Sequence, residues 1–414
     1  MAEGEERVPR RPWRGRRVVL GVTGGVAAYK AVQLARDLTL LGARVDTIVT
    51  TSAERFVGRI SFEAVTGRPV MADLFQVEDA ARHIRLAEEA HLVLVAPATA
   101  DFMARAAQGR ADDLLTAVLL ATSAPVVLAP AMNDGMWAHR QTLRNVDHLR
   151  DVLDYRIAGP TEGRLAHGEG QGAGRMLEPE ELVEHAGRSL EPDPILQGRK
   201  VLVTAGGTRE PIDAVRYVGN RSSGRMGYAL ARAAWRRGGS VTLVSGPSEL
   251  GDPPGVEVVR VETAVEMRDA VDELRGTADL AVFAAAVADY RPTDPVSEKV
   301  KRETQGTSWT VTLEENVHVA ADTRPRAPKG QVAVGFALET EELMAGATRK
   351  LGSGNFDVVV ANPAHEPDAG FDVATNRATI LRKGREPEQL PLLSKDALAE
   401  AVLERSLGVE GDAP

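Results

Sequence analysis

The sequence predicts an α/β protein made of two doubly wound domains in tandem. Short apolar stretches rich in Val, Leu and Ala alternate with amphipathic stretches, which is typical of parallel strands buried between helices. Aromatic residues make up only 4% of the chain, against 43% hydrophobic residues, which argues against an aromatic-rich sandwich. At 414 residues the chain is long enough for two or three domains with cores of their own.

The first half opens with a predicted βαβ unit. The apolar RVVLGVTGG (17–25) ends in a glycine turn, AAYKAVQLARDLTLLG (27–42) has the helical period, and ARVDTIVT (43–50) is a second strand. Further strands are predicted at 91–98 and 125–132, separated by an apolar helix. Parallel strands joined by helices in this way build a doubly wound sheet.

A domain boundary is predicted at EPDPILQG (191–198), where two prolines and a glycine interrupt helix and strand alike. The first domain is therefore placed at 1–190 and the second at 191–414. A second βαβ unit follows at once, and later strands are predicted at 280–288, 331–338 and 356–362. No common period relates the two halves as an internal repeat.

Composition excludes several classes of function. Acidic residues outnumber basic ones by 59 to 50, so no overall positive field attracts nucleic acid or an anionic membrane. The chain has no cysteine, which excludes disulfides and thiolate chemistry. The Arg-rich first 16 residues have no apolar core and are predicted to be a solvated tail rather than a signal peptide. Because the apolar runs are too short to span a bilayer, we predict a soluble, cytoplasmic protein.

The first glycine turn is a candidate anion site. Gly24 and Gly25 lie between strand and helix, where backbone N–H groups at a helix N-terminus can approach a phosphate. A tight turn without a ligand explains them equally well. The turn lacks the G-x-G-x-x-G fingerprint, and Asp46 lies inside its predicted strand rather than at the end, which disfavours a nicotinamide dinucleotide.

Several long motifs, in order, resemble known proteins. GVTGGVAAYK, HIRLAEEA, APATADFM and PAMNDGMW resemble flavin-dependent decarboxylases that act on peptidyl or phosphopantothenoyl cysteine. VLVTAGGTREPIDAVRYVGNRSSGRMG, AAAVADYRP and SEKVK resemble phosphopantothenate-cysteine ligase. Together, from Arg17 to Leu407, they resemble the bacterial bifunctional decarboxylase and ligase of coenzyme A biosynthesis. The resemblance implies a flavodoxin-like domain followed by a second Rossmann-like domain, FMN, Mg²⁺ and CTP, and a dodecameric assembly.

For the first half, the resemblance implies a decarboxylase in which FMN oxidises the substrate thiol to a thioaldehyde that accepts the electrons released with CO₂. It makes His83 the catalytic histidine for the thiol proton, although the residues alone suggest a polar cap. It makes Asn133 the group that holds the substrate carboxylate. The candidate FMN contacts are Gly24, Gly25, Thr50, Ser52 and Thr99.

A glycine-rich flap departs from the family pattern. Where the family has Leu-Ala-Cys-Gly, with the cysteine as proton donor, this chain has His167. Three interpretations stay open: His167 replaces the thiol as the acid, His167 is a bystander on a flap that only covers the flavin, or the reductive step is impaired. The ordinary pKa of imidazole, about 6.5, is closer to neutrality than the roughly 8.5 of a thiol.

For the second half, the resemblance implies that CTP activates 4'-phosphopantothenate as an acyl-cytidylate, which the cysteine amine then attacks. Asn220 would contact this intermediate, and Lys299 would meet the triphosphate. The metal ligands are unknown, and Mg²⁺ is expected to be held largely by the nucleotide phosphates. The candidate nucleotide and substrate contacts are Gly207, Ala285, Ala286, Asp289, Asn316, Phe336 and Lys350.

This half also departs from the pattern. Where the family has Lys-Asn-Pro-Asp, the chain has Glu315, Asn316, Val317 and His318, and Gly354 aligns with a second phosphate-contacting lysine. Strict preference for CTP therefore stays open. The alternatives to a bifunctional enzyme are an active ligase with a flavin-binding regulatory or scaffolding domain, and a dinucleotide-dependent reductase. A yellow protein that releases CO₂ would support the bifunctional enzyme, and a yellow protein that releases no CO₂ would support the ligase with a flavin-binding domain. Binding of a nicotinamide dinucleotide would support the reductase.

Overall fold

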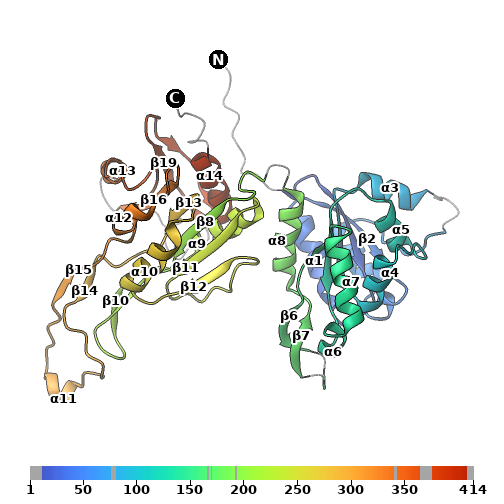
Figure 1. The fold of residues 1–414 in the computed structure, drawn as a ribbon, viewed down its shortest axis with the longest axis horizontal. Helices are drawn as coiled ribbons and strands as arrows, with labels where there is room; N and C mark the ends of the chain where they lie inside the picture. The colour runs from blue at the N-terminus through green and yellow to red at the C-terminus, as the bar shows by residue number, and fades with distance from the viewer. Residues whose placement is uncertain are drawn as a thin grey trace. The chain divides into compact units, whose positions relative to one another are not determined.

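The structure is a computed structural model that describes residues 12–75, 81–165, 167–168, 170–191, 194–339, 343–363 and 375–407. The chain divides between residues 192 and 193 into two compact units. Figure 1 shows both units as ribbons. Each is described by itself.

The first unit contains a five-stranded parallel sheet in the order β2-β1-β3-β4-β5. The crossover after β2 is what a doubly wound topology requires, so the predicted fold class is confirmed. β3 is buried at every position, because helices cover both faces of the sheet. The strands are β1 Arg17–Val22, β2 Arg44–Val49, β3 Leu92–Ala98, β4 Val126–Pro130 and β5 Arg156–Ile157.

Two separate apolar clusters mark the two faces of this sheet. On one face lie α1 Ala28–Leu40, α2 Arg59–Thr66 and α8 Pro179–Leu190. The other face carries α3 Arg82–Glu89, α4 Ala100–Ala107, α5 Leu114–Ala121 and α7 Arg140–Asp151. The remaining elements of this unit are η1 Ala53–Arg55, α6 Asp134–Trp137 and the antiparallel hairpin of β6 Thr161–Arg164 and β7 Gln171–Arg175.

The second unit contains an eight-stranded sheet in the order β12-β11-β8-β13-β16-β17-β19-β20. Its first six strands are parallel, and β19 and β20 add antiparallel pairs beyond β17, so the sheet does not end at β17. The parallel strands are β8 Lys200–Ala205, β11 Ser240–Ser245, β12 Glu257–Arg260, β13 Leu280–Phe283, β16 Val332–Glu339 and β17 Val358–Pro363. The antiparallel strands are β19 Thr379–Arg382 and β20 Glu388–Gln389.

Helices again cover both faces. α9 Arg225–Arg236 and α14 Lys395–Leu407 pack on one face, with α10 Ala264–Arg275 and α13 Leu343–Gly352 on the other. Figure 1 shows the pair β14 Tyr290–Pro292 and β15 Leu313–Glu315, with α11 Arg302–Gln305, as an arm extending away from the sheet. Short elements complete the unit: β9 Arg209–Pro211, β10 Tyr217–Gly219, α12 Val319–Asp322, η2 Arg324–Arg326, β18 Thr375–Asn376 and β21 Leu393–Ser394.

The strand predicted over 280–288 is shorter than expected, because β13 ends at Phe283. The alanine run that follows is a loop whose amides bond to the neighbouring loop after β8. The Ala286 amide donates to the Gly206 carbonyl at 2.8 Å, and the Ala288 amide donates to Oγ1 of Thr208 at 3.0 Å. A hydroxyl partner gives this backbone an alternative to the regular ladder of a strand.

Candidate active sites

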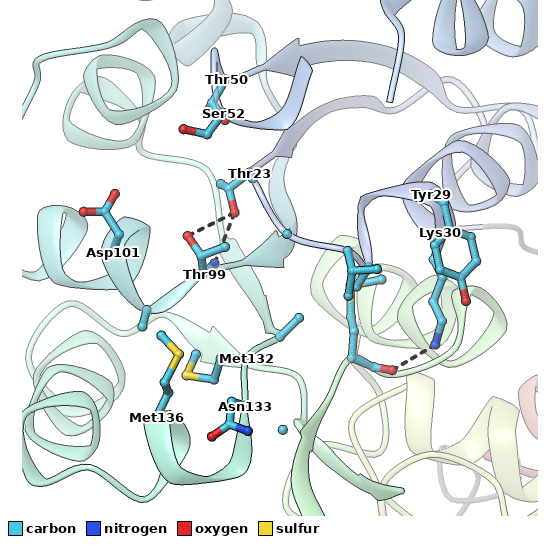
Figure 2. A pocket seen from close by; sticks show the side chains of 18 of the residues that line it. Thr23, Tyr29, Lys30, Thr50, Ser52, Thr99, Asp101, Met132, Asn133 and Met136 are labelled. Carbon is cyan, nitrogen blue, oxygen red and sulfur yellow. Dashed lines mark hydrogen bonds between the residues drawn. The ribbon is translucent and has the colours of Figure 1, made fainter. Parts of the chain in front are cut away.

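A cavity of about 830 Å³ opens at the carboxyl ends of β1, β3 and β4 in the first unit. This is the edge at which doubly wound sheets bind ligands. Figure 2 shows Thr23, Thr50, Ser52 and Thr99 on one side of it and the loop of Met132 and Asn133 on another. Asn133 lines the cavity, and so do all five residues predicted to contact the flavin, which are Gly24, Gly25, Thr50, Ser52 and Thr99.

The two glycines differ in what surrounds them. A Cβ on Gly24 would overlap Ser52, lying 2.8 Å from its carbonyl carbon, so a larger residue cannot occupy this position without a backbone shift. A Cβ on Gly25 would meet only Cγ2 of Thr99, at 3.6 Å, an ordinary contact. The close approach of two backbones therefore requires Gly24. At Gly25 the absence of a side chain leaves the start of α1 open to a ligand.

Threonine hydroxyls join the ends of two strands beneath the cavity. Oγ1 of Thr23 donates to the Pro97 carbonyl at 2.7 Å and accepts from the Thr99 amide at 3.1 Å. Thr99 is the N-cap of α4, and its side chain accepts a hydrogen bond from the Phe102 amide. Two helix N-termini, those of α1 and α4, thus lie at one cavity. Figure 2 shows the bonded threonine pair.

Asn133 lies at the N-cap of the four-residue helix α6. Its Oδ1 accepts from the Gly135 amide at 2.9 Å, which fixes the carboxamide plane. Within the described part of the chain, Nδ2 of Asn133 makes no hydrogen bond, and it is the donor that an anionic substrate group would use.

Residues of both strands of the β6–β7 hairpin form one wall of the cavity. The Met132 amide donates to the Gly174 carbonyl at 3.0 Å, and Arg164, Gly174 and Arg175 line the wall. His167 lies exposed in the turn between β6 and β7 and is not part of the lining of the cavity. The flap predicted from the sequence is thus a β-hairpin that lines the cavity with residues as far along as Leu165, whereas His167 is not part of the lining.

His83 is also outside the lining of this cavity. It lies in the first turn of α3, whose N-cap is Ala81, so the polar-cap interpretation of this histidine is wrong. Its Nδ1 is buried and has no hydrogen-bond partner among the described residues. A buried imidazole nitrogen without a partner is costly, and such atoms occur at functional positions more often than elsewhere.

Sequence reasoning missed the charged groups in the wall of this cavity, among them Lys30 and Arg105. Nζ of Lys30 donates to the Met176 carbonyl at 3.3 Å and to Glu178 at 2.9 Å, which ties α1 to the chain beyond the hairpin. Arg105 bonds to Asp113 at 2.6 Å. Lys30 occupies a position of α1 at which the helical period predicts a buried apolar side chain. A charged residue at such a position was the signal that could have identified it.

The first cavity fits FMN by its own chemistry. A phosphate is suited to the N-terminus of α1, where Gly24 and Gly25 expose backbone N–H groups. Ile48, Leu115 and Met132 supply the apolar surface that a flat ring system needs. Hydroxyl and amide groups for orientation come from Thr50, Ser52, Thr99 and Asn133.

A second cavity, of about 750 Å³, lies in the second unit at the ends of β13 and β16. Its lining contains most of the predicted nucleotide and substrate contacts, which are Asn220, Ala285, Ala286, Asp289, Asn316, Phe336 and Lys350. Gly207 is outside the lining but pairs with Ala286, and a Cβ there would lie 2.8 Å from the Asn220 carbonyl oxygen. Lys299, on the arm, and Gly354, after α13, do not line the cavity, and Lys299 is exposed.

Amide side chains hold the alanine loop of this second cavity. Nδ2 of Asn220 donates to the Val287 carbonyl at 2.9 Å, and Nδ2 of Asn316 donates to the Ala288 carbonyl at 3.1 Å. On the opposite wall, Lys350 donates to the Phe336 carbonyl and lies over the Phe356 ring, with Nζ 5.3 Å from the centroid. The cavity therefore combines a loop backed by amide side chains with cationic side chains suited to a phosphate, which are Arg225, Lys350 and Lys395.

The residues that depart from the family pattern line this second cavity as well: Glu315, Val317 and His318. His318 is the N-cap of α12, and its Nδ1 accepts from the Ala321 amide at 3.1 Å. Histidine thus caps the helix through its ring nitrogen. Glu315 places a negative charge in the wall, so any triphosphate must be balanced by other groups.

No group of three acidic or histidine side chains able to hold a metal ion occurs among the described residues. Within the same ranges, no helix combines the length and the apolar character that crossing a bilayer requires.

Two α/β units, each with a cavity at the carboxyl ends of its parallel strands, define a two-domain enzyme of the Rossmann-like class. The Flavoprotein family model matches residues 6–190, and the model for the DNA/pantothenate metabolism flavoprotein C-terminal domain matches residues 196–408. The chain belongs to the family of coenzyme A biosynthesis bifunctional proteins.

Curated relatives support this membership over 94% of the chain. The coenzyme A biosynthesis bifunctional protein CoaBC of Mycobacterium tuberculosis is 45% identical over 402 residues, which cover 94% of this chain and 96% of the relative. CoaBC of Vibrio cholerae is 43% identical over 393 residues, covering 94% and 97%. The crystal structure of the C-terminal domain of a CoaBC protein is 37% identical over 53% of this chain and 100% of that one, with a TM-score of 0.45.

Family membership confirms the function predicted from the motifs. The protein is a bifunctional enzyme of coenzyme A biosynthesis that combines a decarboxylase with a ligase.

Proposed function

We propose that residues 1–190 form the FMN-dependent phosphopantothenoylcysteine decarboxylase domain and residues 191–414 the CTP-dependent phosphopantothenate-cysteine ligase domain. One observation carries the assignment: each unit has its own cavity, and each cavity gathers most of the residues that its own half of the sequence supplied as candidates. The ligase product is the decarboxylase substrate, so the domains act in the reverse of their order in the chain.

In the decarboxylase domain, bound FMN supplies two-electron oxidation of the substrate thiol and later return of the hydride. Gly24, Gly25, Thr50, Ser52 and Thr99 hold the cofactor. The Asn133 carboxamide donates to the substrate carboxylate and positions it until CO₂ leaves.

Two histidines are assigned to the protons of this reaction. His83 accepts the thiol proton. His167 donates a proton in the reductive half, in place of the cysteine expected at this flap. Its position two residues after Leu165, which lines the cavity, supports this role, and the movement needed is a bend of the hairpin turn toward the cavity.

In the ligase domain, the 4'-phosphopantothenate carboxylate attacks the α-phosphorus of CTP and forms an acyl-cytidylate with release of pyrophosphate, and the cysteine amine then displaces CMP. Asn220 contacts the intermediate, and Lys299 stabilises the phosphate charge. Mg²⁺ is bound mainly through the phosphates. Gly207, Ala285, Ala286, Asp289, Asn316, Phe336 and Lys350 form the nucleotide and substrate walls.

We also propose a homo-oligomer, a dodecamer, working in the cytoplasm. His83 and Lys299 lie outside the cavities of their own chain, which supports sites completed by neighbouring copies. Light scattering of the purified protein measures the mass, and a monomer that retains full activity would contradict completion by neighbours.

One experiment tests both halves. The purified chain is supplied with 4'-phosphopantothenate, cysteine, CTP and Mg²⁺, and products are identified by mass. We expect 4'-phosphopantetheine, CO₂, CMP and a yellow protein. A protein that stays colourless after incubation with FMN would refute the assignment of the first domain. For His167→Ala, we expect CO₂ release with accumulation of the enethiol; an unchanged product profile would refute its role as the acid.

A further inference from the structure

Lys299 lies on the arm of the second unit, exposed and outside the lining of the cavity in its own chain. Its placement therefore depends on how the arm is attached where it leaves the sheet. At this place β14 lies against β9 and β10, which pair as a hairpin. The Val296 amide, beyond β14, donates to the Ile212 carbonyl at 3.1 Å. The turn of the β9–β10 hairpin, residues 212–216, is thus the point of attachment.

A buried carboxylate forms the centre of this attachment. Asp213 lies in the hairpin turn, and its side chain has no exposed surface. Oδ1 of Asp213 accepts from the Val215 amide at 2.8 Å and from the Arg216 amide at 2.7 Å, so it holds the turn. Oδ2 accepts from the amide of Val300, the residue next to Lys299, at 3.1 Å. One carboxylate thus joins a tight turn to a segment of the arm 87 positions further along the chain.

Arg216 completes the attachment from the same turn. Its Nη1 donates to Oδ2 of Asp213 at 2.6 Å and to the Val300 carbonyl at 3.3 Å. Its guanidinium group lies over the ring of Trp309, 5.2 Å from the centroid, and Trp309 belongs to the part of the arm that returns after α11. The outgoing and the returning part of the arm are therefore both attached to one turn.

The same hairpin leads into the second cavity. Asn220 directly follows β10, lines the cavity and donates through Nδ2 to the Val287 carbonyl at 2.9 Å. Asp213 is therefore connected to Asn220 through β10 and to Lys299 through the arm. A side chain that fixes two such groups relative to one another contributes to catalysis without touching the substrate.

We propose that Asp213 is a positioning residue of the ligase reaction, which fixes the base of the arm so that Lys299 meets the triphosphate. The inference rests on the role proposed above for Lys299. Asp213 lines neither of the two cavities, so it acts through the arm rather than on the nucleotide.

Asp213→Asn tests the contact with little change of shape. The amide oxygen can keep the two bonds within the turn, whereas the NH₂ group then faces the Val300 amide, donor against donor. In the full-length protein we expect kcat/KM for CTP to fall about 10-fold or more, because the charge of Lys299 is displaced from the reacting phosphate. Decarboxylation of supplied phosphopantothenoylcysteine should be unchanged. If Asp213→Asn fails to fold, Asp213→Ser replaces it, since one hydroxyl can hold the turn but leaves the Val300 amide without its acceptor.

A double-mutant cycle with Lys299→Gln separates positioning from a general loss of stability. If Asp213 acts through Lys299, adding Asp213→Asn to Lys299→Gln causes no further fall in kcat/KM. Glu210→Gln is the matched control, because Glu210 is a buried acid of β9 that accepts from the Ala264 amide at 3.0 Å instead of from the arm. Its effect should be the same with and without Lys299→Gln.

Two results would overturn the inference alone: Asp213→Asn with the kcat/KM of wild type, or effects of Asp213→Asn and Lys299→Gln that multiply independently. A Lys299→Gln protein with the kcat/KM of wild type would refute the role proposed for Lys299, and the inference would fall with it.

Discussion

The amide of Met132 donates to the carbonyl of Gly174 at 3.0 Å, which fastens the β6–β7 hairpin to the loop that carries Asn133. Gly174 lies so close that a Cβ would overlap the carbonyl oxygen of Met132 and come within 3.3 Å of the Asn133 carbonyl carbon. The wall of the flavin cavity is therefore held in place by a contact between two backbones.

Gly174→Ala is expected to move the hairpin away from this loop and to lower decarboxylase turnover at least 10-fold, because misplacing a group by about 1 Å can cost roughly 100-fold in rate. Ligase turnover should stay within 2-fold. CO₂ release from supplied phosphopantothenoylcysteine measures the effect. Gly58→Ala is the control, since a Cβ at Gly58 meets only Ile60, at 3.9 Å. Equal activity of Gly174→Ala and Gly58→Ala would show that the contact is dispensable.

Gly24→Ala and Gly25→Ala form a matched pair in the turn before α1. The first introduces a Cβ into Ser52, and the second meets only Cγ2 of Thr99 at 3.6 Å. We expect Gly24→Ala to lose bound flavin and to unfold at a lower temperature, whereas Gly25→Ala keeps the wild-type melting temperature. Flavin absorbance measures the bound cofactor, and thermal unfolding measures the melting temperature. If Gly25→Ala is colourless but keeps the wild-type melting temperature, the cofactor lies directly against Gly25.

Lys350→Gln removes one of the cations in the wall of the second cavity, which Arg225 and Lys395 also line. Loss of a charge-assisted hydrogen bond of about 1.5–3 kcal/mol predicts a rise in KM for CTP of roughly 10-fold or more. Decarboxylation of supplied phosphopantothenoylcysteine should be unaffected. Lys383→Gln is the control, because Lys383 is exposed and lies 4.0 Å from Asp357 outside the cavity. An unchanged KM in Lys350→Gln would remove Lys350 from the nucleotide site.

Glu400 on α14 forms a buried ion pair with Arg236 on α9 at 2.6 Å, with side-chain exposures of 4% and 5%. Glu400→Gln removes the negative charge that faces this buried guanidinium, which predicts a loss of about 3–5 kcal/mol in the free energy of unfolding. Asp396→Asn is the comparison, since Asp396 pairs with Arg232 at 2.9 Å but is 64% exposed and should cost less than about 1 kcal/mol. Urea unfolding followed by circular dichroism measures both, and equal losses would contradict the argument from burial.

His185 predicts a pH dependence of stability. Its pKa is lowered from 6.5 to about 4 in the folded state, mainly by burial and then by Arg156 and Arg188. Above pH 6.5 the ring is neutral in both states; between pH 6.5 and 4 only the unfolded chain takes up the proton, so stability falls as the pH falls. The expected loss from pH 7 to pH 5 is at most about 2 kcal/mol. His185→Gln should remove this contribution, whereas His148→Gln, at an exposed position of α7, should leave it. Identical pH profiles for wild type and His185→Gln would contradict it.

Much of the fold follows from local pattern. The strand, glycine turn and helix predicted from residue 17 appear as β1 and α1. Apolar period and glycine position act over a few residues, so they are visible in a single stretch of sequence. The end of β13 at Phe283 was not predictable in this way, because the partners of the alanine run come from the loop after β8, about 80 positions earlier.

The sequence by itself determined the class of the protein and its two-part organisation and supplied candidate residues for each half, since these depend on short motifs whose order along the chain can be read directly. Only the tertiary structure decided which of those residues share a cavity: it brings Asn133 to Gly24 and leaves His83 and His167 outside. It also revealed Lys30 in the wall and the attachment of the arm to Asp213. The physical reason is that charge, burial and hydrogen-bond satisfaction depend on distances between segments, which packing of the whole unit sets.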